Sequence, residues 1–463
     1  MVDSLFHGSR IDHAIMTVAL SADGTPAVSP GAGKPRGRAV GGPVASLIVS
    51  RLGEIIAPSR LGADYRRLLA ASWTANLGDG IALAAGPLLI ASQTHDPRLV
   101  ALAGLLQRVP WLLIGLYAGV LADRLDRRRI MILANVARVA VLAVLIATIL
   151  TGRVSITVTL AAMFALGLAE TFEDVTATTF LPMLVQPADL GIANARLMSG
   201  FITANQLAGP PIGALLFAVG TATPFAVEAG CVALGAVLIS RMAMPTPAAA
   251  RPGAQARQQV RREIAEGFRW LWRHRNVRTL ALTIVTFNVT FGAAWSVLVL
   301  YALQRLHMGE VGFGLLTTSS AIGGLAGTAL YRRLERAVSL ANIMRGGLVI
   351  ETFTHLALAV TTTPAVALAV FFVFGAHAFV WGTTSTTVRQ RAVPVEFQGR
   401  VGSVYMIGVV GGMVVGGALG GVIANRWGVT APFWFAFVGS ALILAAIWRE
   451  LAHIAHADTD PVG

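Results

Sequence analysis

Charge is scarce in this sequence, and its scarcity limits the possible folds. Only 13% of the 463 residues are charged, while 55% are hydrophobic. A typical soluble domain carries roughly 25% charged residues, so this chain has too little polar surface for a soluble particle of its size. Cysteine is almost absent as well, because Cys231 is the only one, which excludes an intrachain disulfide.

The motifs of common enzyme and cofactor sites are also missing. The only lysine is Lys34, and no Gly-x-x-x-x-Gly-Lys-Ser/Thr loop is present with which the chain could bind ATP phosphates. No cluster of His, Cys and Asp has the spacing of metal ligands, and no nucleophile lies beside a general base. The sequence therefore predicts no enzyme activity, no metal site and no bound cofactor.

Long apolar runs are what the sequence has in abundance. Each is about 20 residues long, which is the length needed to cross a hydrocarbon core roughly 30 Å thick. Backbone polar groups in lipid must be satisfied within the segment, so these runs are predicted to be helices. We predict an all-α polytopic membrane protein with transmembrane helices near residues 67–92, 99–122, 130–150, 155–179, 195–219, 222–243, 277–303, 310–332, 340–361, 363–388, 400–424 and 430–451.

The arginines lie mainly between apolar runs, on alternate connections. One set of loops holds Arg124 to Arg129, Arg332 to Arg336 and Arg389 to Arg400, whereas the other set has only isolated arginines. The positive-inside rule places the basic set in the cytoplasm, so both termini are predicted to be cytoplasmic in a multi-pass protein of the inner membrane. The formal net charge of +13 is thus attributed to topology and anionic lipid rather than to a nucleic-acid partner.

The spacing of the runs divides the chain into five parts. We expect a disordered tail at 1–64, six-helix halves at 65–243 and 277–452, a cytoplasmic linker at 244–276 and a short tail at 453–463. Within the linker, apolar residues from Val260 to Trp272 recur at three- and four-residue spacing between arginines. This pattern predicts an amphipathic helix on the membrane surface, with Trp270 and Trp272 at headgroup depth.

The two halves are related as repeats at an offset of about 208 residues. The matching glycines are Gly104, Gly115 and Gly119 with Gly312, Gly323 and Gly327, and Gly200, Gly209 and Gly213 with Gly408, Gly417 and Gly421. Parallel repeats about an axis along the membrane normal suit a transporter that rocks around a central site.

At this point the sequence resembles the major facilitator superfamily. Residues Gly119 to Arg128 resemble its loop 2–3 motif, Gly-x-x-x-Asp-Arg-x-Gly-Arg-Arg, with Asp126 in place of the usual glycine. Residues Gly200 to Gly213 resemble the fifth-helix motif of drug–proton antiporters. Asn76 to Asp79 and Glu170 to Asp174 are similar to the branch that contains enterobactin and macrolide exporters. The resemblance implies twelve helices in two pseudo-symmetric six-helix bundles.

The resemblance implies a conformational latch in the loop between the second and third helices. Asp123 and the arginines would hold the second helix against the eleventh and fourth helices in the outward-facing state. Two acids of the fourth helix are expected within reach of the loop arginines. The alternative is an ordinary basic loop with topological meaning only. The residues assigned to this latch are Gly119, Asp123, Arg124, Arg127, Arg128, Glu173 and Asp174.

Two ionisable residues are predicted at similar depth in the first two helices. Asp79 lies about 20 Å from the inner face at 1.5 Å per residue, and Arg108 lies at nearly the same depth. A charge at mid-bilayer costs at least about 2.5 kcal/mol and normally faces a partner or a cavity. We therefore expect the two to pair, either as a proton site or as a static pair that fixes helix packing.

Further polar residues are candidates for a central cavity. By resemblance the first, fourth, seventh and tenth helices line it, so Glu170 and His377 would face substrate, unless His377 is a packed core residue. Glu228, and Glu351 with His355, are expected on peripheral helices in structural roles. The amides that would add hydrogen-bonding groups to the cavity, or join helices, are Asn76, Asn205, Gln206 and Asn288.

The fifth-helix motif is predicted to shape the helix rather than to react. Pro210 and Pro211 remove two amide donors and bend the helix. Gly200, Gly209 and Gly213 allow close approach of a neighbour, either as a dry interface that blocks leak and favours antiport or as a generic packing seam.

These observations predict a proton-coupled exporter of a lipophilic small molecule such as a drug or siderophore. Its partners would be substrate, protons and membrane lipid, with the proton gradient as energy source and the protein as a monomer. The alternatives are an uptake carrier for a small metabolite on the same fold, or a membrane scaffold or sensor that does not transport.

Overall fold

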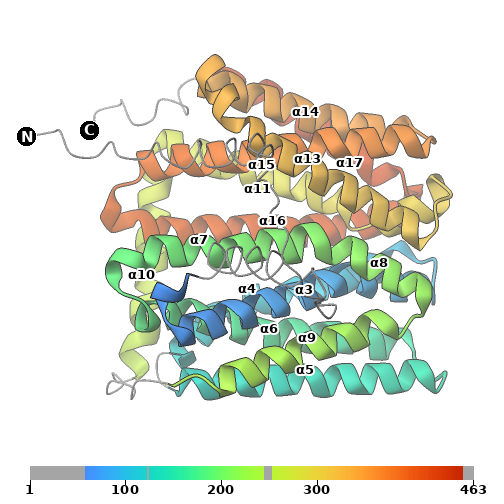
Figure 1. The fold of residues 1–463 in the computed structure, drawn as a ribbon. Coiled ribbons are helices and arrows are strands. Elements are labelled where there is room, and N and C mark those ends of the chain that lie inside the picture. The colour runs from blue at the N-terminus through green and yellow to red at the C-terminus, as the bar shows by residue number, and fades with distance from the viewer. Residues whose placement is uncertain (1–57, 123–124, 244–252, 452–463) are drawn as a thin grey trace, which may run out of the picture. The chain divides into compact units, whose positions relative to one another are not determined.

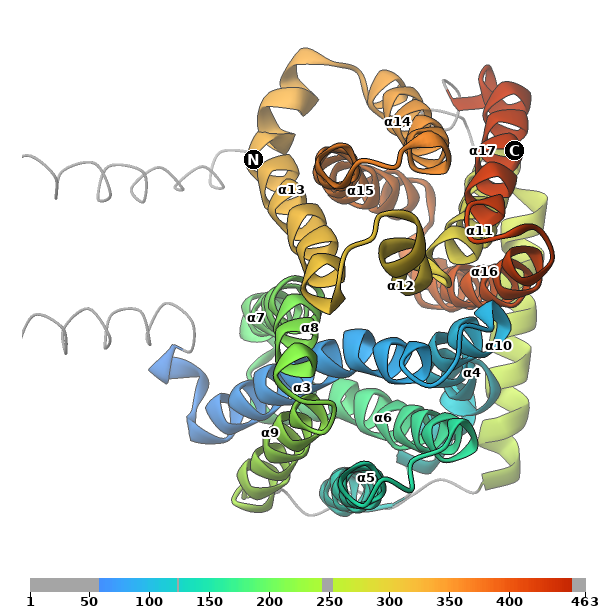
Figure 2. The same cartoon turned by 90° about the vertical axis from the view of Figure 1, so that its right-hand side faces the viewer.

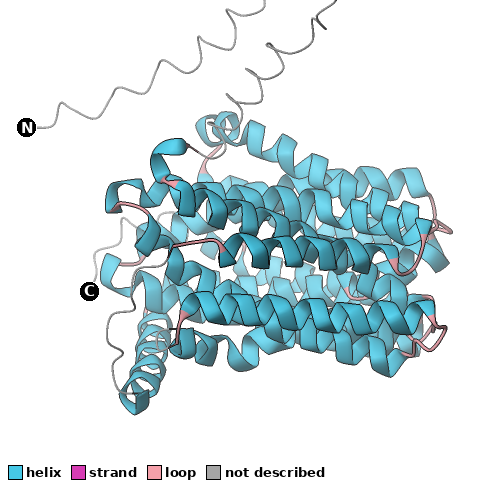
Figure 3. Cartoon of the chain, turned by 60° about the horizontal axis from the view of Figure 1, so that its bottom comes forward, coloured by secondary structure: helices cyan, strands magenta, loops and turns pink. Residues whose placement is uncertain are grey.

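The described part of the chain is almost entirely helical. The computed structural model describes residues 58–122, 125–243 and 253–451. Within these ranges the chain forms helices joined by loops and contains no strand (Figures 1 and 3). The predicted all-α fold is confirmed.

The N-terminal half holds six helical segments of membrane-spanning length. The fifth is continuous but changes character, because a π-helical segment, η3 (Phe201–Ala208), separates α7 from α8. The helices are α3 (Ala63–Ala91), α4 (Pro97–Ala122), α5 (Arg127–Leu150), α6 (Ile156–Leu184), α7 (Leu190–Gly200), α8 (Gly209–Val219) and α9 (Thr223–Ser240).

The C-terminal half follows the same order. Its first helix, α11 (Arg275–Trp295), is extended by the short α12 (Leu298–Leu300) and the π-helical η4 (Tyr301–Arg305). The remaining helices are α13 (Glu310–Ala337), α14 (Leu340–Val360), α15 (Pro364–Ala392), α16 (Gln398–Trp427) and α17 (Ala431–Ile447). Eleven helical segments of the described chain are long and apolar enough to cross a membrane, and α17 is a twelfth apolar helix of 17 residues.

The packing inside the two halves repeats. Helix α3 packs on α8 and α9 as α11 packs on α16 and α17, and α4 packs on α6 as α13 packs on α15. One pair of glycines carries this equivalence: Gly167 lies against the backbone of Gln107, and Gly375, 208 residues later, lies against the backbone of Ser320. A side chain at either glycine would overlap that backbone, so both pairs of helices depend on the missing Cβ.

The halves meet along two helix pairs, α4 with α16 and α8 with α13 (Figure 2). At the first, Gly421 lies beside Ala101, where an added Cβ would come 2.9 Å from the Ala101 Cβ. At the second, Gly314 lies beside Ala214 at a corresponding distance of 2.8 Å. Small residues thus bring the two halves close together at these points.

A separate helix, α10 (Gly253–Arg273), crosses one end of both halves, and we call this end the α10 end (Figures 1 and 2). It is anchored on α16, since Gly267 packs on the Arg400 backbone and Glu266 Oε2 lies 3.3 Å from Arg400 Nη1. A hydrogen bond from Arg262 lowers the pKa of the Glu266 carboxyl and keeps it charged. The helix lies where the sequence predicts it.

The two tryptophans of α10 face different environments. Trp272 is 49% exposed and stacks on Phe268, which is 50% exposed. Trp270 instead stacks on Phe397 with ring centroids 5.7 Å apart. The Trp270 ring thus packs on protein, and the headgroup depth of both tryptophans stays a prediction.

Among the residues whose side chains are described, the hydrophobic core joins the halves only at the end opposite α10. There one continuous cluster includes Leu88 and Phe217 of the N-terminal half and Leu298 and Phe433 of the C-terminal half. Towards the α10 end, the remaining core clusters each lie within one half, or between the C-terminal half and α10. The space between the halves is therefore sealed at the far end only.

Candidate functional site

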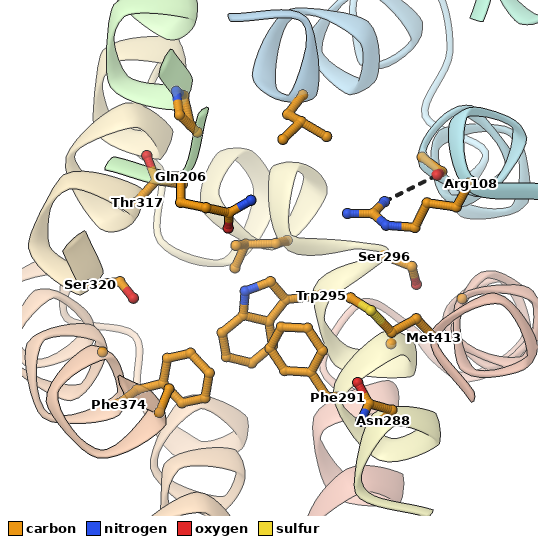
Figure 4. A pocket seen from close by; sticks show the side chains of 18 of the residues that line it. Arg108, Gln206, Asn288, Phe291, Trp295, Ser296, Thr317, Ser320, Phe374 and Met413 are labelled. Carbon is orange, nitrogen blue, oxygen red and sulfur yellow. Dashed lines mark hydrogen bonds between the residues drawn. The ribbon is translucent and has the colours of Figure 1, made fainter. Parts of the chain in front are cut away.

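A cavity of about 650 Å³ lies between the halves (Figure 4). The N-terminal half contributes Arg108 and Gln206, whose side chains project into the space. Phe291, Trp295 and Phe374 of the C-terminal half cover the opposite side. This volume is within the range of small-molecule binding sites.

The aromatic side of the cavity is a connected cluster. Phe291 stacks on Trp295 with centroids 4.4 Å apart, and Trp295 lies 4.6 Å from the Phe374 ring. Phe371 joins at 5.4 Å from Trp295. We call Phe291, Trp295, Phe371 and Phe374 the aromatic cluster. Its rings hold one another in place, so the cavity has a rigid apolar wall for a flat or lipophilic molecule.

Glu351 also lines the cavity, together with His377. Glu351 Oε2 lies 2.8 Å from His377 Nε2, and Glu351 Oε1 lies 3.7 Å from His355 Nε2. The predicted pairing of Glu351 with His355 is therefore present at 3.7 Å, but the expectation that Glu351 is peripheral is wrong, because it lines the cavity. The closer partner of Glu351 comes from α15, because α14 turns this carboxylate inward towards the cavity.

A buried ionic cluster lies inside the N-terminal half, apart from the cavity. Its centre is Arg138 of α5, whose side chain is 1% exposed. Asp79 of α3 accepts a hydrogen bond from Arg138 Nη2, Glu173 of α6 accepts one from Nη1 at 2.9 Å, and Glu228 Oε1 of α9 lies 3.7 Å from Nη2. Asn135 donates to Glu173 at 3.2 Å. We call these five residues the Arg138 cluster.

The Arg138 cluster corrects the predicted pair of Asp79 and Arg108. Asp79 is buried and points to α5, whereas Arg108 lines the cavity and donates to the Gly104 carbonyl of its own helix at 3.1 Å. Equal depth did not bring them together, because the two side chains leave their helices in different directions. Glu228, which we expected in a peripheral structural role, belongs to the cluster.

The two acids of α6 assigned to the latch do not contact the loop arginines. Glu173 is buried against Arg138, eleven residues before α6 ends at Leu184, so it is too deep to reach the loop. Asp174 is exposed. Glu170 is half-buried and is not among the cavity-lining residues, so the prediction that it faces the central cavity is wrong.

The loop arginines contact other groups. Arg127 donates to the Met183 sulfur at 2.9 Å, and Arg128 donates to the Ser240 carbonyl. The predicted contact of these arginines with Glu173 or Asp174 is therefore wrong in this conformation. Asp123 and Arg124 lie outside the described residues, and Gly119 lies in the last turn of α4.

Asp126, which replaces the usual glycine of the motif, has a clear role in the structure. Its side chain accepts from the backbone N–H of Arg128 at 3.0 Å and of Arg129 at 3.3 Å. These are two of the donors at the start of α5 that have no partner within the helix. Asp126 is thus the N-cap of α5, a position at which aspartate is strongly favoured.

The fifth-helix motif packs within its own half. Gly200 lies against Trp73, Gly209 against the Gly80 backbone and Gly213 against the Ile81 backbone, all on α3. The close approach of a neighbouring helix expected at these glycines is therefore confirmed, and the neighbour is α3 of the same half. Pro210 lines the cavity.

The prolines of this motif account for the change of helix type before it. Pro210 and Pro211 have no backbone N–H and therefore cannot donate hydrogen bonds to carbonyls of the preceding turn. The backbone before them adopts the wider π-helical form of η3.

The predicted amides divide between cavity and helix packing. Gln206 and Asn288 line the cavity, and Asn288 also donates to the Ile284 carbonyl at 2.8 Å. Asn205 is buried, and its side-chain oxygen accepts from Gln206 at 2.8 Å. Asn76 is not among the cavity-lining residues, and its amide donates to the Ser72 carbonyl at 2.8 Å. Its predicted place in the cavity is wrong.

Sequence reasoning missed Arg138, the central residue of the ionic cluster. The signal was present, because Arg138 is the only charged residue between Ile130 and Leu150 and Asn135 lies three residues earlier on the same helix face. The cost of a charge at mid-membrane applies to Arg138 as much as to Asp79. The described residues hold no group of three or more His, Cys, Asp or Glu side chains placed to bind a metal ion.

Comparisons with known proteins agree with the fold. Residues 54–461 match the family model described as transmembrane secretion effector. The chain is 28% identical over 387 residues to the multidrug efflux pump Tap of Mycolicibacterium fortuitum, covering 79% of this chain and 90% of that protein. It is 24% identical to the MFS-type transporter YfiS of Bacillus subtilis (strain 168), covering 79% and 88%.

Solved structures show the same fold at low sequence identity. A bacterial homologue of the iron transporter ferroportin in its inward-facing state aligns with a TM-score of 0.65 at 15% identity, covering 85% of this chain and 98% of that one. A bacterial homologue of the human lysosomal transporter Spinster aligns with a TM-score of 0.62 at 15% identity, covering 86% and 97%.

Proposed function

The chain belongs to the major facilitator superfamily, in the family of transmembrane secretion effectors, and on that premise we propose that it is a proton-coupled exporter of lipophilic small molecules. It is a multi-pass membrane transporter, and its helices form the two halves that alternating access requires. The similarity to a multidrug efflux pump over 79% of the chain supports export.

The cavity supports a lipophilic substrate. It is closed at the far end by the core that joins the halves, and the aromatic cluster forms one wall. Because the core clusters remain separate towards the α10 end, a substrate could enter there. Closing that end and separating α4 from α16 and α8 from α13 would expose the cavity on the other side.

The orientation of the protein follows from its arginines. The basic loops lie at the α10 end, and α10 itself carries Arg262, Arg269 and Arg273. The positive-inside rule supports a cytoplasmic location for the α10 end, where α3 begins and α17 ends. The conformation with the far end sealed is the one that loads substrate from the cytoplasm.

The single observation that carries proton coupling is the excess of carboxyls around Arg138. Asp79, Glu173 and Glu228 surround one guanidinium, so three ionised acids would leave a net charge of −2 deep in the membrane. Uncompensated charge there is costly, and binding a proton removes it. The cluster joins α3, α5, α6 and α9, so a proton gained or lost changes how four helices are held together.

Glu228 is the acid best suited to carry a proton in this conformation. Both oxygens of Glu173 accept hydrogen bonds, from Arg138 and Asn135, as suits a carboxylate. Glu228 Oε2 is buried with no hydrogen-bond partner among the described residues, and Oε1 is 3.7 Å from the nearest guanidinium nitrogen. Glu170 and Asp174 on α6 are the other acids that act on the cluster electrostatically.

Everted membrane vesicles test the proposal. Addition of a transported compound should dissipate an imposed pH gradient in vesicles with the wild-type protein, and the response should be lost in Asp79→Asn. Arg153→Gln, which alters an exposed loop residue, is the control for expression and insertion. No response to a broad panel of lipophilic compounds, with the protein correctly inserted, would contradict export by proton exchange and favour a scaffold or sensor.

A further inference from the structure

The ionic groups that line the cavity are not balanced between its two sides. Arg108 stands on the N-terminal side and Glu351 on the C-terminal side. Glu351 already has His377 within hydrogen-bond distance at 2.8 Å. The carboxylate of Glu351 therefore has a partner in the cavity wall, whereas the guanidinium of Arg108 has no partner of opposite charge among the described residues.

The guanidinium of Arg108 makes one hydrogen bond, from Nη1 to the Gly104 carbonyl, and no carboxylate of the described residues forms an ion pair with it. A guanidinium has five N–H donors in a planar fork. Figure 4 shows this fork pointing into the cavity, towards the same space as the Gln206 amide and the Trp295 ring. Apart from the bond to Gly104, the guanidinium forms no hydrogen bond with the described residues.

The competing charges are few. Glu170 of α6 attracts Arg108 electrostatically, but it lies beyond ion-pair distance. On the opposite wall the titratable groups are Glu351, His377 and Tyr405, and Glu351 contacts His377. An anion that enters the cavity therefore meets Arg108 without displacing an existing ion pair.

We propose that the cavity selects amphipathic organic anions, with a substrate carboxylate bound by Arg108 and the apolar body of the substrate lying on the aromatic cluster. A carboxylate fits the guanidinium fork by two parallel hydrogen bonds, which are stronger than bonds between neutral groups. Gln206 and Ser296 are polar residues of the same cavity wall. A lipophilic cation would instead be repelled by Arg108.

This assignment rests on the proposed transport function, because it names the substrate class of the same cavity. It adds a prediction that transport alone does not make: a neutral or cationic analogue of equal size should bind less well than the acid. Binding can be measured at equilibrium without any proton gradient, so the two proposals can fail separately.

The test uses the full chain in lipid nanodiscs and three radiolabelled probes that share one ring system: 1-naphthylacetate, 1-naphthylacetamide and 1-naphthylmethylammonium. The wild-type protein should bind the acid about tenfold more tightly than the amide, since one charge-assisted pair contributes at least that factor. The ammonium probe should bind more weakly than the amide.

Single-residue variants test whether Arg108 causes the preference for the acid over the amide. Arg108→Gln should abolish the preference for the acid over the amide, so that the two probes bind about equally, while Arg108→Lys keeps part of the preference because it keeps the charge. Phe374→Leu should weaken the binding of the acid and of the amide by the same factor. Arg153→Gln makes the same chemical change on an exposed loop and should leave all affinities unaltered.

The outcomes separate the two proposals. Equal binding of the three probes by the wild-type protein, or an acid preference that survives Arg108→Gln, overturns the anion assignment. If the acid preference depends on Arg108 but no compound moves protons in everted vesicles, the anion site stands and proton coupling fails. Retained folding of Arg108→Gln is checked by monodisperse elution and by a melting temperature close to that of the wild-type protein.

Discussion

The two halves of the molecule share a helix arrangement but differ sharply in what they bury at matched positions. At an offset of 208 or 209 residues, the Arg138 cluster is replaced by apolar and small residues: Asp79, Arg138, Glu173 and Glu228 correspond to Phe287, Gly347, Trp381 and Ala436. In the N-terminal half the Glu173 carboxylate meets the Arg138 guanidinium. In the C-terminal half the Trp381 ring lies against Gly347, where an added Cβ would come within 3.3 Å of it.

This difference separates two tasks that a coupled transporter must perform. The charged cluster of the N-terminal half lies away from the cavity and holds four helices together, as a site for protons requires. The C-terminal half supplies the aromatic cluster and the Glu351–His377 pair to the cavity wall. On the N-terminal side of the cavity, Arg108 is the charged residue among the described lining residues. In our account, protons act on one half and the apolar part of the substrate on the other.

The largest effect is expected from Arg138→Met, which would leave three buried carboxyls without their cation. Removing one partner of a buried ionic network typically costs about 3–5 kcal/mol. The variant should unfold at a much lower temperature in detergent than the wild-type protein, whereas Arg153→Met in an exposed loop should not.

A neutral version of the whole cluster sharpens this first prediction. Arg138→Met combined with Asp79→Asn, Glu173→Gln and Glu228→Gln should recover part of the lost stability, because no unpaired charge remains, but should not transport against a gradient. Equal melting temperatures of Arg138→Met and wild type would refute the description of the cluster.

Within the cluster, Glu173→Gln should be more destabilising than Glu228→Gln. Glu173 accepts two hydrogen bonds, at 2.9 and 3.2 Å, one of them from a charged donor, and its loss should cost about 2 kcal/mol. Glu228 is 3.7 Å from Arg138, and glutamine resembles its protonated form, so its replacement should cost well under about 1 kcal/mol. Thermal unfolding of the two variants side by side measures the difference, and the reverse order would contradict our assignment of the proton to Glu228.

A matched pair of glycines tests whether the repeat is broken at the fifth-helix motif. Gly209→Ala would place a Cβ on the Gly80 backbone, while the equivalent Gly417→Ala has only the Ser296 Cβ nearby, at 3.8 Å. The first should cost about 1–3 kcal/mol through overpacking, and the second should be close to neutral. Yield of monodisperse protein and thermal stability provide the comparison. Similar losses for both would show that the halves pack alike here.

The smallest effect is expected at the N-cap of α5. Asp126→Ala should cost about 1 kcal/mol, because two backbone donors lose their acceptor, and Asp126→Gly only a few tenths. In the C-terminal half, Ser339 caps α14 through one contact of 3.4 Å, so Ser339→Ala should cost less than Asp126→Ala. Identical unfolding curves for Asp126→Ala and wild type would refute the capping role.

Much of the fold could be predicted from the sequence, because lipid imposes simple rules on length and hydropathy. The predicted runs lie within a few residues of the helices, as for 130–150 against Arg127–Leu150. The repeat was visible in the glycines because close helix contacts depend on the absence of a Cβ, as at Gly323 and Gly327 against α15. Asn288 and His377 line the cavity from the seventh and tenth helices, which the resemblance assigned to it, whereas Arg108 and Gln206 lie on the second and fifth helices.

The partners of the buried charges could not be predicted, since sequence gives depth in the membrane but not direction around a helix. Arg108 and Arg138 both lie deep enough to meet Asp79, and only the rotation of α3 decides between them. The depth of Glu173 was misjudged for another reason. Helix α6 continues to Leu184, beyond the predicted end at residue 179, so Glu173 lies farther from the loop than expected.

Transport by proteoliposomes tests the division of tasks most directly, with one variant from each half. An imposed pH gradient should drive accumulation of 1-naphthylacetate by the wild-type protein. Asp79→Asn should lose this accumulation but still exchange labelled for unlabelled substrate at equilibrium, whereas Phe374→Leu should remain coupled and need a higher substrate concentration for half-maximal rate. Gradient-driven accumulation by Asp79→Asn at the wild-type level would contradict the account.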